Sequence, residues 1–192
     1  MKIGLLGGSF NPIHNGHLIL AEKALHDLDL DEIWFLPVGN HPLKKSNDLL
    51  DFDQRVELLE LSLAENKKLK VSTRDRDQGD FNYTDKLMKN LYKEFPQDSF
   101  VFITGMDIIR EIHRWHNYQW LMENVEFVVF TRPGIDSDRD RFERFSNFEY
   151  IDMKPIPISS TDIRNRISRG ENIEGLVPDR ILEKVYHYYS VK

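Results

Sequence analysis

Two histidines stand three residues apart at the start of a segment with helical periodicity. His14 and His17 follow the stretch GGSFNP, which runs from Gly7 to Pro12. If a helix starts near Asn15, both imidazoles lie along one face of its first turn. Free backbone N–H groups and the helix dipole favour an anion at that end, and the imidazoles add further donors. The pattern therefore indicates a phosphate-binding site.

The same stretch also has a structural interpretation, in which Gly7 and Gly8 shape a turn after a strand and the histidines cap the helix. Glycine permits such a turn, and it also permits close approach of the backbone to a ligand. The stretch has neither the Gly-Lys-Ser/Thr ending of the Walker pattern nor the G-x-G-x-x-G dinucleotide fingerprint. Glycines and histidines together favour a phosphate ligand over capping alone.

A second polar cluster lies near the C-terminus, in the segment ISSTDIRNRI from Ile158 to Ile167. Its hydroxyl side chains belong to Ser159, Ser160 and Thr161. These hydroxyls stand at an expected helix N-terminus, and Arg164, about one turn later, adds a planar guanidinium that suits phosphate oxygens. Taken alone, the segment also fits an ordinary helix N-cap with Asp162 in the first turn.

Alternating strand-like and helix-like segments must position these clusters. Five apolar runs predict strands, at residues 2–6, 32–38, 68–73, 99–104 and 125–131. Helical periodicity follows His17 and recurs over residues 51–65 and 83–95. This order predicts an α/β fold with a doubly wound, mostly parallel sheet of Rossmann type and helices on both faces. Ligands bind such sheets at the carboxyl ends of the strands, so we expect the site where the first strand ends.

Composition excludes several classes of function. The chain has 192 residues, which predicts one domain over residues 1–192 with a helical C-terminal portion from about residue 159. A net charge of -6 argues against a nucleic-acid partner. There are no cysteines and no apolar run of ~20 residues, so we expect no disulfide, no membrane partner and a cytoplasmic location. The charged segment 134–145 is interpreted as a solvated loop or short surface helix.

The motifs together resemble those of the nucleotidylyltransferase superfamily. His14-Asn15-Gly16-His17 matches its (H/T)-x-G-H signature after a G-G-S/T-F-D/N-P lead, and ISSTDIR matches its I-S-S-T-x-I-R segment. The resemblance implies a Rossmann-like nucleotidylyltransferase fold that binds the triphosphate of ATP or CTP. It also implies that a phosphate of the second substrate attacks the α-phosphorus directly and releases pyrophosphate. Mg²⁺ would be bound mainly through the ATP phosphates, with no metal ligands from the protein.

Within this superfamily the whole chain is similar to the bacterial nicotinate mononucleotide adenylyltransferases. The similarity covers TGMD (104–107), NYTDKL (82–87) and the tryptophan segment that ends in Arg-Pro-Gly (115–134). It implies catalytic roles for His14, His17, Lys44 and Arg164. It implies an ATP site formed by Gly7, Gly8, Ser9, Phe10, His14, His17, Gly105, Asp107, Arg132, Ser159, Ser160, Thr161 and Arg164. It implies an acceptor site formed by Asn11, Lys44, Tyr83, Thr84 and Trp115.

The resemblance also assigns individual roles. Asp107 is expected near the adenylate ribose, because a carboxylate can accept from two vicinal hydroxyls. Arg132 is expected near the phosphates, and Trp115 is expected to stack on the pyridine ring, although core packing is its alternative. Thr84 would receive the nicotinate carboxylate. Core packing is expected for Trp120, and His113 and His116 are interpreted as surface residues.

Two positions depart from the family pattern. In HPLK (41–44), Leu43 stands where the family has histidine, whereas Lys44 keeps the cation. Lys44 or Lys45 is expected to meet phosphate, with a solvated pair as the alternative. The family commonly has an acid two residues after the threonine, whereas here Asp85 follows Thr84 directly. A carboxylate at this position would repel a nicotinate carboxylate unless it is turned away.

We therefore expect an adenylyltransferase of NAD biosynthesis that forms nicotinate adenine dinucleotide and pyrophosphate from ATP and nicotinate mononucleotide. One alternative is a pantetheine-phosphate adenylyltransferase, which gives no reason for the Tyr-Thr and Trp segments. Another is a non-catalytic dinucleotide-sensing module, which needs affinity but no transition-state charge stabilisation. The sequence leaves open whether the chain forms a homo-oligomer.

Overall fold

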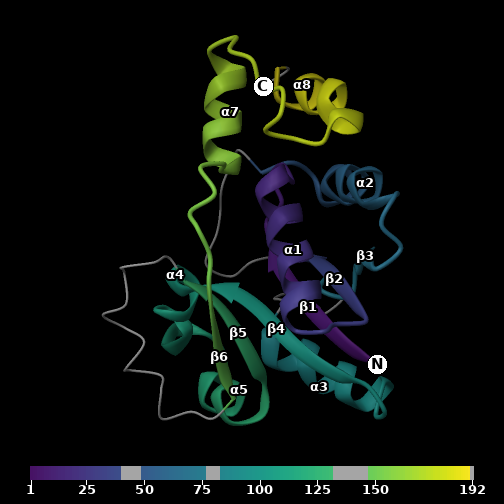
Figure 1. Ribbon diagram of the computed structural model, residues 1–192, viewed down its shortest axis with the longest axis vertical. Coiled ribbons are helices and arrows are strands. Elements are labelled where there is room, and N and C mark those ends of the chain that lie inside the picture. The colour runs from purple at the N-terminus through teal and green to yellow at the C-terminus, as the bar shows by residue number, and fades with distance from the viewer. Residues whose placement is uncertain (40–48, 77–82, 132–146, 191–192) are drawn as a thin grey trace.

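A parallel sheet of six strands forms the centre of the molecule (Figure 1). The computed structural model describes residues 1–39, 49–76, 83–131 and 147–190, without the side chains of Asp107 and Ile108. The strands are β1 (Lys2–Gly8), β2 (Glu32–Pro37), β3 (Leu69–Val71), β4 (Ser99–Gly105), β5 (Glu126–Thr131) and β6 (Phe148–Asp152). Their order, β3-β2-β1-β4-β5-β6, is that of a doubly wound Rossmann sheet, so the predicted fold class is confirmed.

Helices connect the strands and extend the C-terminal part of the chain. The described helices are α1 (Asn15–Asp27), α2 (Phe52–Leu63), α3 (Thr84–Glu94), α4 (Met106–Ile109), α5 (Tyr118–Asn124), α7 (Ser160–Ser168) and α8 (Leu182–Ser190). Two short 3₁₀ helices cover Ile112–Arg114 and Asp179–Ile181. The helices predicted after His17 and over residues 51–65 and 83–95 are confirmed, whereas β6 and the two short helices α4 and α5 were not predicted.

The two faces of the sheet bury separate apolar cores. Along β4, Val101 and Ile103 belong to the core shared with α1, α2, α7 and α8. Phe100 and Phe102 alternate with them and belong to the core shared with α3, α4 and α5. This period of two is the pattern of a strand that is buried on both faces. The continuous apolar character of the sequence at β4 arises because each face has its own helical layer.

The strand order reverses at β1, where the next strands along the chain lie on opposite sides. Leu6 of β1 pairs with Phe35 of β2 on one side and with Ile103 of β4 on the other. In sheets of this kind the crevice outside the carboxyl ends of the strands at the reversal is the ligand site. The ligand site is therefore expected at the segments that follow Gly8 and Gly105.

The C-terminal helices α7 and α8 lie at one end of the molecule, beyond α1 and α2 (Figure 1). The side chain of Tyr189 in α8 is nearly buried, and its hydroxyl donates to Oδ1 of Asn11 at 2.5 Å. The last helix is thereby joined to the first loop of the chain. Within the described ranges, no helix has the length and apolar character needed to cross a membrane.

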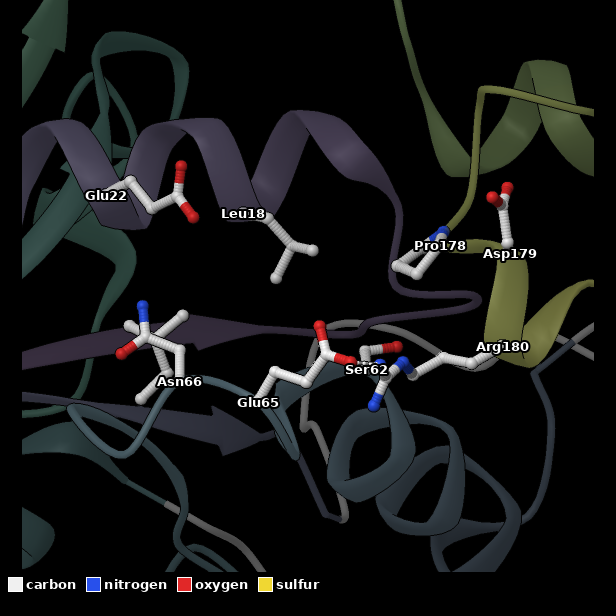
Figure 2. A pocket seen from close by; sticks show the side chains of 9 residues that line it. Leu18, Glu22, Ser62, Glu65, Asn66, Pro178, Asp179 and Arg180 are labelled. Carbon is white, nitrogen blue, oxygen red and sulfur yellow. Dashed lines mark hydrogen bonds and ion pairs between the residues drawn. The ribbon is translucent and has the colours of Figure 1, made fainter.

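A cavity of about 430 Å³ lies between α1, the end of α2 and the segment around Pro178 (Figure 2). Leu18 points into it from α1, and Arg180 pairs with Glu65 at its border. Among the predicted site residues that the structure describes, none lines this cavity.

Candidate active site

The loop from Ser9 to His14 connects β1 to α1. The sequence places Gly7 and Gly8 after the strand, but both lie within β1, so that interpretation is wrong. A Cβ atom at Gly8 would come within 3.0 Å of the Phe10 ring, so the glycine makes room for a packed aromatic side chain. The positive φ of the turn, 46°, belongs to Phe10 itself. The Phe10 side chain is 2% exposed and packs against Phe35.

The two histidines of the motif meet at the start of α1. Helix α1 begins at Asn15, as the sequence predicts, and the rings of His14 and His17 stack with centroids 3.7 Å apart. The backbone N–H of His14 donates to Nδ1 of His17 at 3.2 Å. Because Nδ1 of His17 accepts, the neutral ring carries its proton on Nε2. The edge of the His17 ring also packs on Phe10, at 5.0 Å between centroids.

Burial keeps both imidazoles neutral. It lowers the pKa of His14 to about 4. The pKa of His17 also lies well below its ordinary value, because of burial and then because of the neighbouring His14. Within the described part of the chain, the buried Nδ1 atom of His14 has no hydrogen-bond partner. The pair therefore offers neutral hydrogen-bonding groups beside a helix N-terminus, which suits a phosphate group that replaces the missing partner.

The C-terminal motif docks on the same loop. Nη1 of Arg164 donates to the carbonyl oxygen of Asn11 at 2.7 Å. The hydroxyl of Ser160 donates to the carbonyl oxygen of Pro12 at 2.8 Å. Ser159 caps α7 by accepting from the backbone N–H of Asp162 at 3.1 Å. The two clusters predicted from distant parts of the sequence are thus brought together. The plain N-cap interpretation is correct for Ser159, while Arg164 reaches the other motif.

A buried arginine that was not predicted from the sequence, Arg55, holds the loop in place. Arg55 is 2% exposed and donates from Nη1 to the carbonyl of Ser9, from Nη2 to that of Val38 and from Nε to that of Leu50, at 2.9 to 3.1 Å. Its guanidinium thus joins the ends of β1 and β2 to the start of α2. Its position within an amphipathic helical segment gave no signal of this role.

The side chain of Asn11 is a second buried connection that sequence reasoning did not foresee. Its Oδ1 atom accepts from the backbone N–H of Leu50 at 3.1 Å as well as from the Tyr189 hydroxyl. Asn11 was assigned to the acceptor site by resemblance, and in the structure this oxygen holds three segments of the chain together. The loop is therefore preorganised by groups that lie outside it.

A glycine marks open space at the end of the neighbouring strand. A Cβ atom at Gly105 would meet no atom of the described residues within 4 Å, unlike one at Gly8. The hydroxyl of Thr104, one residue earlier, is buried and finds no hydrogen-bond partner among the described residues. The end of β4 thus has room for a ligand, and the Thr104 hydroxyl there can form a hydrogen bond to it. Thr104 lies within the TGMD segment, but no site role was predicted for it.

The residues assigned to the acceptor form a second group, at the start of α3 and before α5. Thr84 is the first residue of α3 and Tyr83 is its N-cap. Trp115 follows the 3₁₀ helix, is partly buried, and packs edge-on against Phe102 with centroids 6.0 Å apart. Trp115 thus packs against the core, as in the alternative interpretation, while part of its side chain stays exposed. Trp120 is partly buried against the same core, as expected.

The carboxylate of Asp85, the acid that departs from the family pattern, is surrounded by hydrogen-bond donors. Its side chain is 2% exposed and accepts from Nδ1 of His116 at 2.8 Å and from Nζ of Lys89 at 2.9 Å. The charge that would repel a carboxylate is therefore compensated within the protein. His116 is a surface residue, as expected, with a side chain that is 48% exposed, and its ring also contacts this buried carboxylate.

Several predicted residues cannot be placed. Lys44, Lys45, Leu43 and Arg132 lie outside the described residues, as does the segment 134–145. Asp107 lies in α4, but its side chain is not described. Their roles stay predictions. In the described ranges, no group of three or more histidine, cysteine or acidic side chains is arranged to hold a metal ion.

Comparison with known proteins decides between the superfamily members. The sequence profile of the cytidylyltransferase-like family matches residues 5–166. A probable nicotinate-nucleotide adenylyltransferase of Flavobacterium johnsoniae is 35% identical over 187 residues, covering 97% of each chain. That of Flavobacterium psychrophilum is 36% identical with the same coverage. The chain belongs to the nicotinate-nucleotide adenylyltransferase family.

A solved structure of this family shows the same fold. The nicotinic acid mononucleotide adenylyltransferase of Plasmodium falciparum, solved in complex with NaAD, aligns with a TM-score of 0.82 at 20% identity. The alignment covers 100% of this chain and 99% of that one. The Rossmann-like nucleotidylyltransferase architecture predicted from the motifs is therefore confirmed over the whole chain.

The family's signature glycine, Gly16, has a steric reason that can be tested. A Cβ atom there would lie 3.0 Å from Nδ1 of His14 and 3.2 Å from Cγ2 of Ile156. We expect Gly16→Ala to displace the His14 ring by a few tenths of an ångström and to lower kcat by about tenfold, since small misplacements at a reacting centre are costly. The helix itself should gain up to about 1 kcal/mol from alanine.

Kinetics and urea unfolding of the same preparation check this expectation. Gly170 has φ +70° and open space around it, so Gly170→Ala is a control that strains the backbone away from the motif. Parental kcat in Gly16→Ala would show that the ring position is not critical.

Proposed function

We propose that the protein transfers the adenylyl group of ATP to nicotinate mononucleotide and thereby forms nicotinate adenine dinucleotide and pyrophosphate. The observation that carries this proposal is the stacked, neutral pair of His14 and His17 at the start of α1, which follows a loop that accepts a hydrogen bond from Arg164 of the C-terminal motif. Membership of the family and the activity for which its relatives are named support the choice of substrates.

The reaction is a direct displacement at phosphorus. An oxygen of the acceptor phosphate forms a bond to the α-phosphorus of ATP, while the bond from that phosphorus to the bridging oxygen breaks and pyrophosphate leaves with the electron pair. No protein nucleophile takes part. Catalysis of this kind rests on positioning and on stabilisation of charge on the phosphate oxygens.

The groups at the loop suit that task. Nε2–H of His17 and the guanidinium of Arg164 donate hydrogen bonds, and the N-terminus of α1 favours negative charge. Because these groups are donors and not carboxylates, they fit phosphate oxygens and not a metal ion. We therefore propose that Mg²⁺ is held by the triphosphate, where it neutralises charge on the leaving group.

The acceptor ring is proposed to lie between Trp115 and the start of α3. Backbone N–H groups at a helix N-terminus lack partners within the helix, and Thr84 is the first residue of α3. A nicotinate carboxylate can accept from these groups, whereas the amide of nicotinamide would turn an N–H₂ donor toward donors. This mismatch underlies a preference for the acid.

Pyrophosphate release from ATP, measured with a panel of phosphorylated acceptors, tests the proposed function. We expect release with nicotinate mononucleotide and formation of the dinucleotide in equal amount. Release only with phosphopantetheine would assign the protein to a different adenylyltransferase activity. Binding of the dinucleotide without turnover of any acceptor would identify a sensing module.

The preference for the acid is expected to be at least about tenfold in kcat/KM, which corresponds to one mismatched hydrogen bond. In Thr84→Val the ratio between nicotinate and nicotinamide mononucleotides should shrink, because the hydroxyl is lost. Trp115→Ala is the matched control: it should raise KM for both acceptors and leave their ratio nearly unchanged, since stacking does not distinguish acid from amide. Equal use of both acceptors by the parent protein would refute the role of Thr84.

A further inference from the structure

The carboxylate of Asp85 links two segments that are distant in the sequence. Besides His116 and Lys89, it accepts from Nδ2 of Asn117 at 3.2 Å. Burial acts to raise the pKa of Asp85, but hydrogen bonds from these three side chains hold it below its ordinary value. The ionised carboxylate is therefore the form on which the linkage depends.

Two of the three donors belong to the turn between the 3₁₀ helix and α5. Asn117 is the N-cap of α5 and has a left-handed backbone with φ 52°, a conformation that costs energy for a residue other than glycine. The hydrogen bond from its side chain to Asp85 helps to hold it in this conformation. The shape of the turn therefore depends on a residue of α3.

An aromatic contact makes a second connection between the same two segments. The ring of Tyr83 stacks on the ring of His116 with centroids 4.3 Å apart and an angle of 27° between the planes. His116 is thus held by its face, through Tyr83, and by its Nδ1–H edge, through Asp85. The side chain of His116 is 48% exposed, so the contact lies at the border of the molecule and not in its core.

Each of these paired residues directly follows a residue of the proposed acceptor site. Asp85 follows Thr84 in α3, and His116 follows Trp115. We propose that Asp85 and His116 are positioning residues that fix the distance between Thr84 and Trp115 and so determine how the pyridine end of the acceptor is held. This inference rests on the proposed function, which supplies the acceptor.

The contacts of Asp85 also explain how a carboxylate is tolerated beside a site that is proposed to bind an anion. The ammonium group of Lys89 bonds to Asp85 from one turn further along α3 and lies over the ring of Trp120 at 4.5 Å. The carboxylate is thereby neutralised from the helix side while His116 and Asn117 bind it from the turn side.

Matched substitutions of His116 test the proposal. His116→Asn keeps an N–H donor close to the place of Nδ1, and His116→Phe keeps a ring to stack on Tyr83 but has no donor. We expect the phenylalanine variant to raise KM for nicotinate mononucleotide about tenfold, as for loss of a hydrogen bond to a charged group, with KM for ATP unchanged. The asparagine variant should lie much closer to the parent protein.

A double-variant cycle completes the test. If the pair acts as a unit, Asp85→Asn combined with His116→Phe should raise KM no more than the worse single variant. His113→Phe is the control, because His113 contacts only the backbone of its own turn among the described residues. Parental KM values in His116→Phe, or equal losses for ATP and acceptor, would overturn the proposal while the parent activity stands. No turnover of nicotinate mononucleotide by the parent protein would instead overturn the proposed function.

Discussion

His17→Ala is expected to lower kcat about 10²- to 10³-fold and to leave the fold intact. The magnitude is that of removing one preorganised donor from the position where charge develops in a transition state. The Nδ1 atom of His17 is occupied by the backbone N–H of His14, which orients the ring and leaves the proton on Nε2. Alanine removes the donor and also removes the ring that stacks on His14.

Steady-state kinetics with ATP and nicotinate mononucleotide measure this loss, and thermal unfolding of the same samples measures stability. His26→Ala is the control, because His26 lies in the last turn of the same helix and its side chain is 89% exposed. A variant at position 17 with parental turnover would refute the assignment of the phosphate site. A large loss of thermal stability with full activity per folded molecule would show that the histidines serve only as caps.

Arg55→Met is expected to lower the free energy of unfolding by about 3–5 kcal/mol, because three carbonyl groups lose their donor at about 1–3 kcal/mol for each one that is left unsatisfied. Methionine fills much of the volume but donates no hydrogen bond. The carbonyl groups of Ser9, Val38 and Leu50 would then lose their donor in a place that water does not reach easily.

Urea unfolding gives the change, and an unchanged m-value shows that the native fold persists. Arg55→Lys should recover little, because a single ammonium cannot span three carbonyl groups as the planar guanidinium does. Arg76→Met is the matched control: Arg76 pairs with the exposed Asp53 and should cost less than about 1 kcal/mol. A loss at position 55 as small as at position 76 would show that the loop is fixed by other contacts.

The sequence predicts the sheet well where strands are buried on both faces. Continuous apolar runs at β1, β4 and β5 are typical of strands that are buried on both faces between helical layers. Strand β6 was missed because it lies at the edge of the sheet, where its residues are only partly buried and its pattern FEYID mixes polar and apolar side chains. An edge strand needs less apolar surface, and so it leaves a weaker trace in the sequence.

Some residues of the candidate site could be predicted from the sequence and others could not. Groups that act through local spacing, such as His14 and His17 on one helical turn, can be placed from the sequence. Groups that act through tertiary contacts cannot, and Arg55 and Asp85 are the clearest cases. Nothing in the local sequence of Arg55 shows that it reaches the carbonyls of Ser9 and Val38. Likewise, nothing around Asp85 shows that a turn more than thirty residues away covers it.

The hydrogen bond between Tyr189 and Asn11 joins residues 178 positions apart, and this separation has a consequence during protein synthesis. At about 5–20 residues per second, a ribosome needs roughly 9–36 s to add that length of chain after Asn11 has been incorporated. Throughout this interval the nascent loop lacks the partner that closes it. Activity is therefore expected only after Tyr189 has been synthesised, so that chains shorter than this consume no ATP.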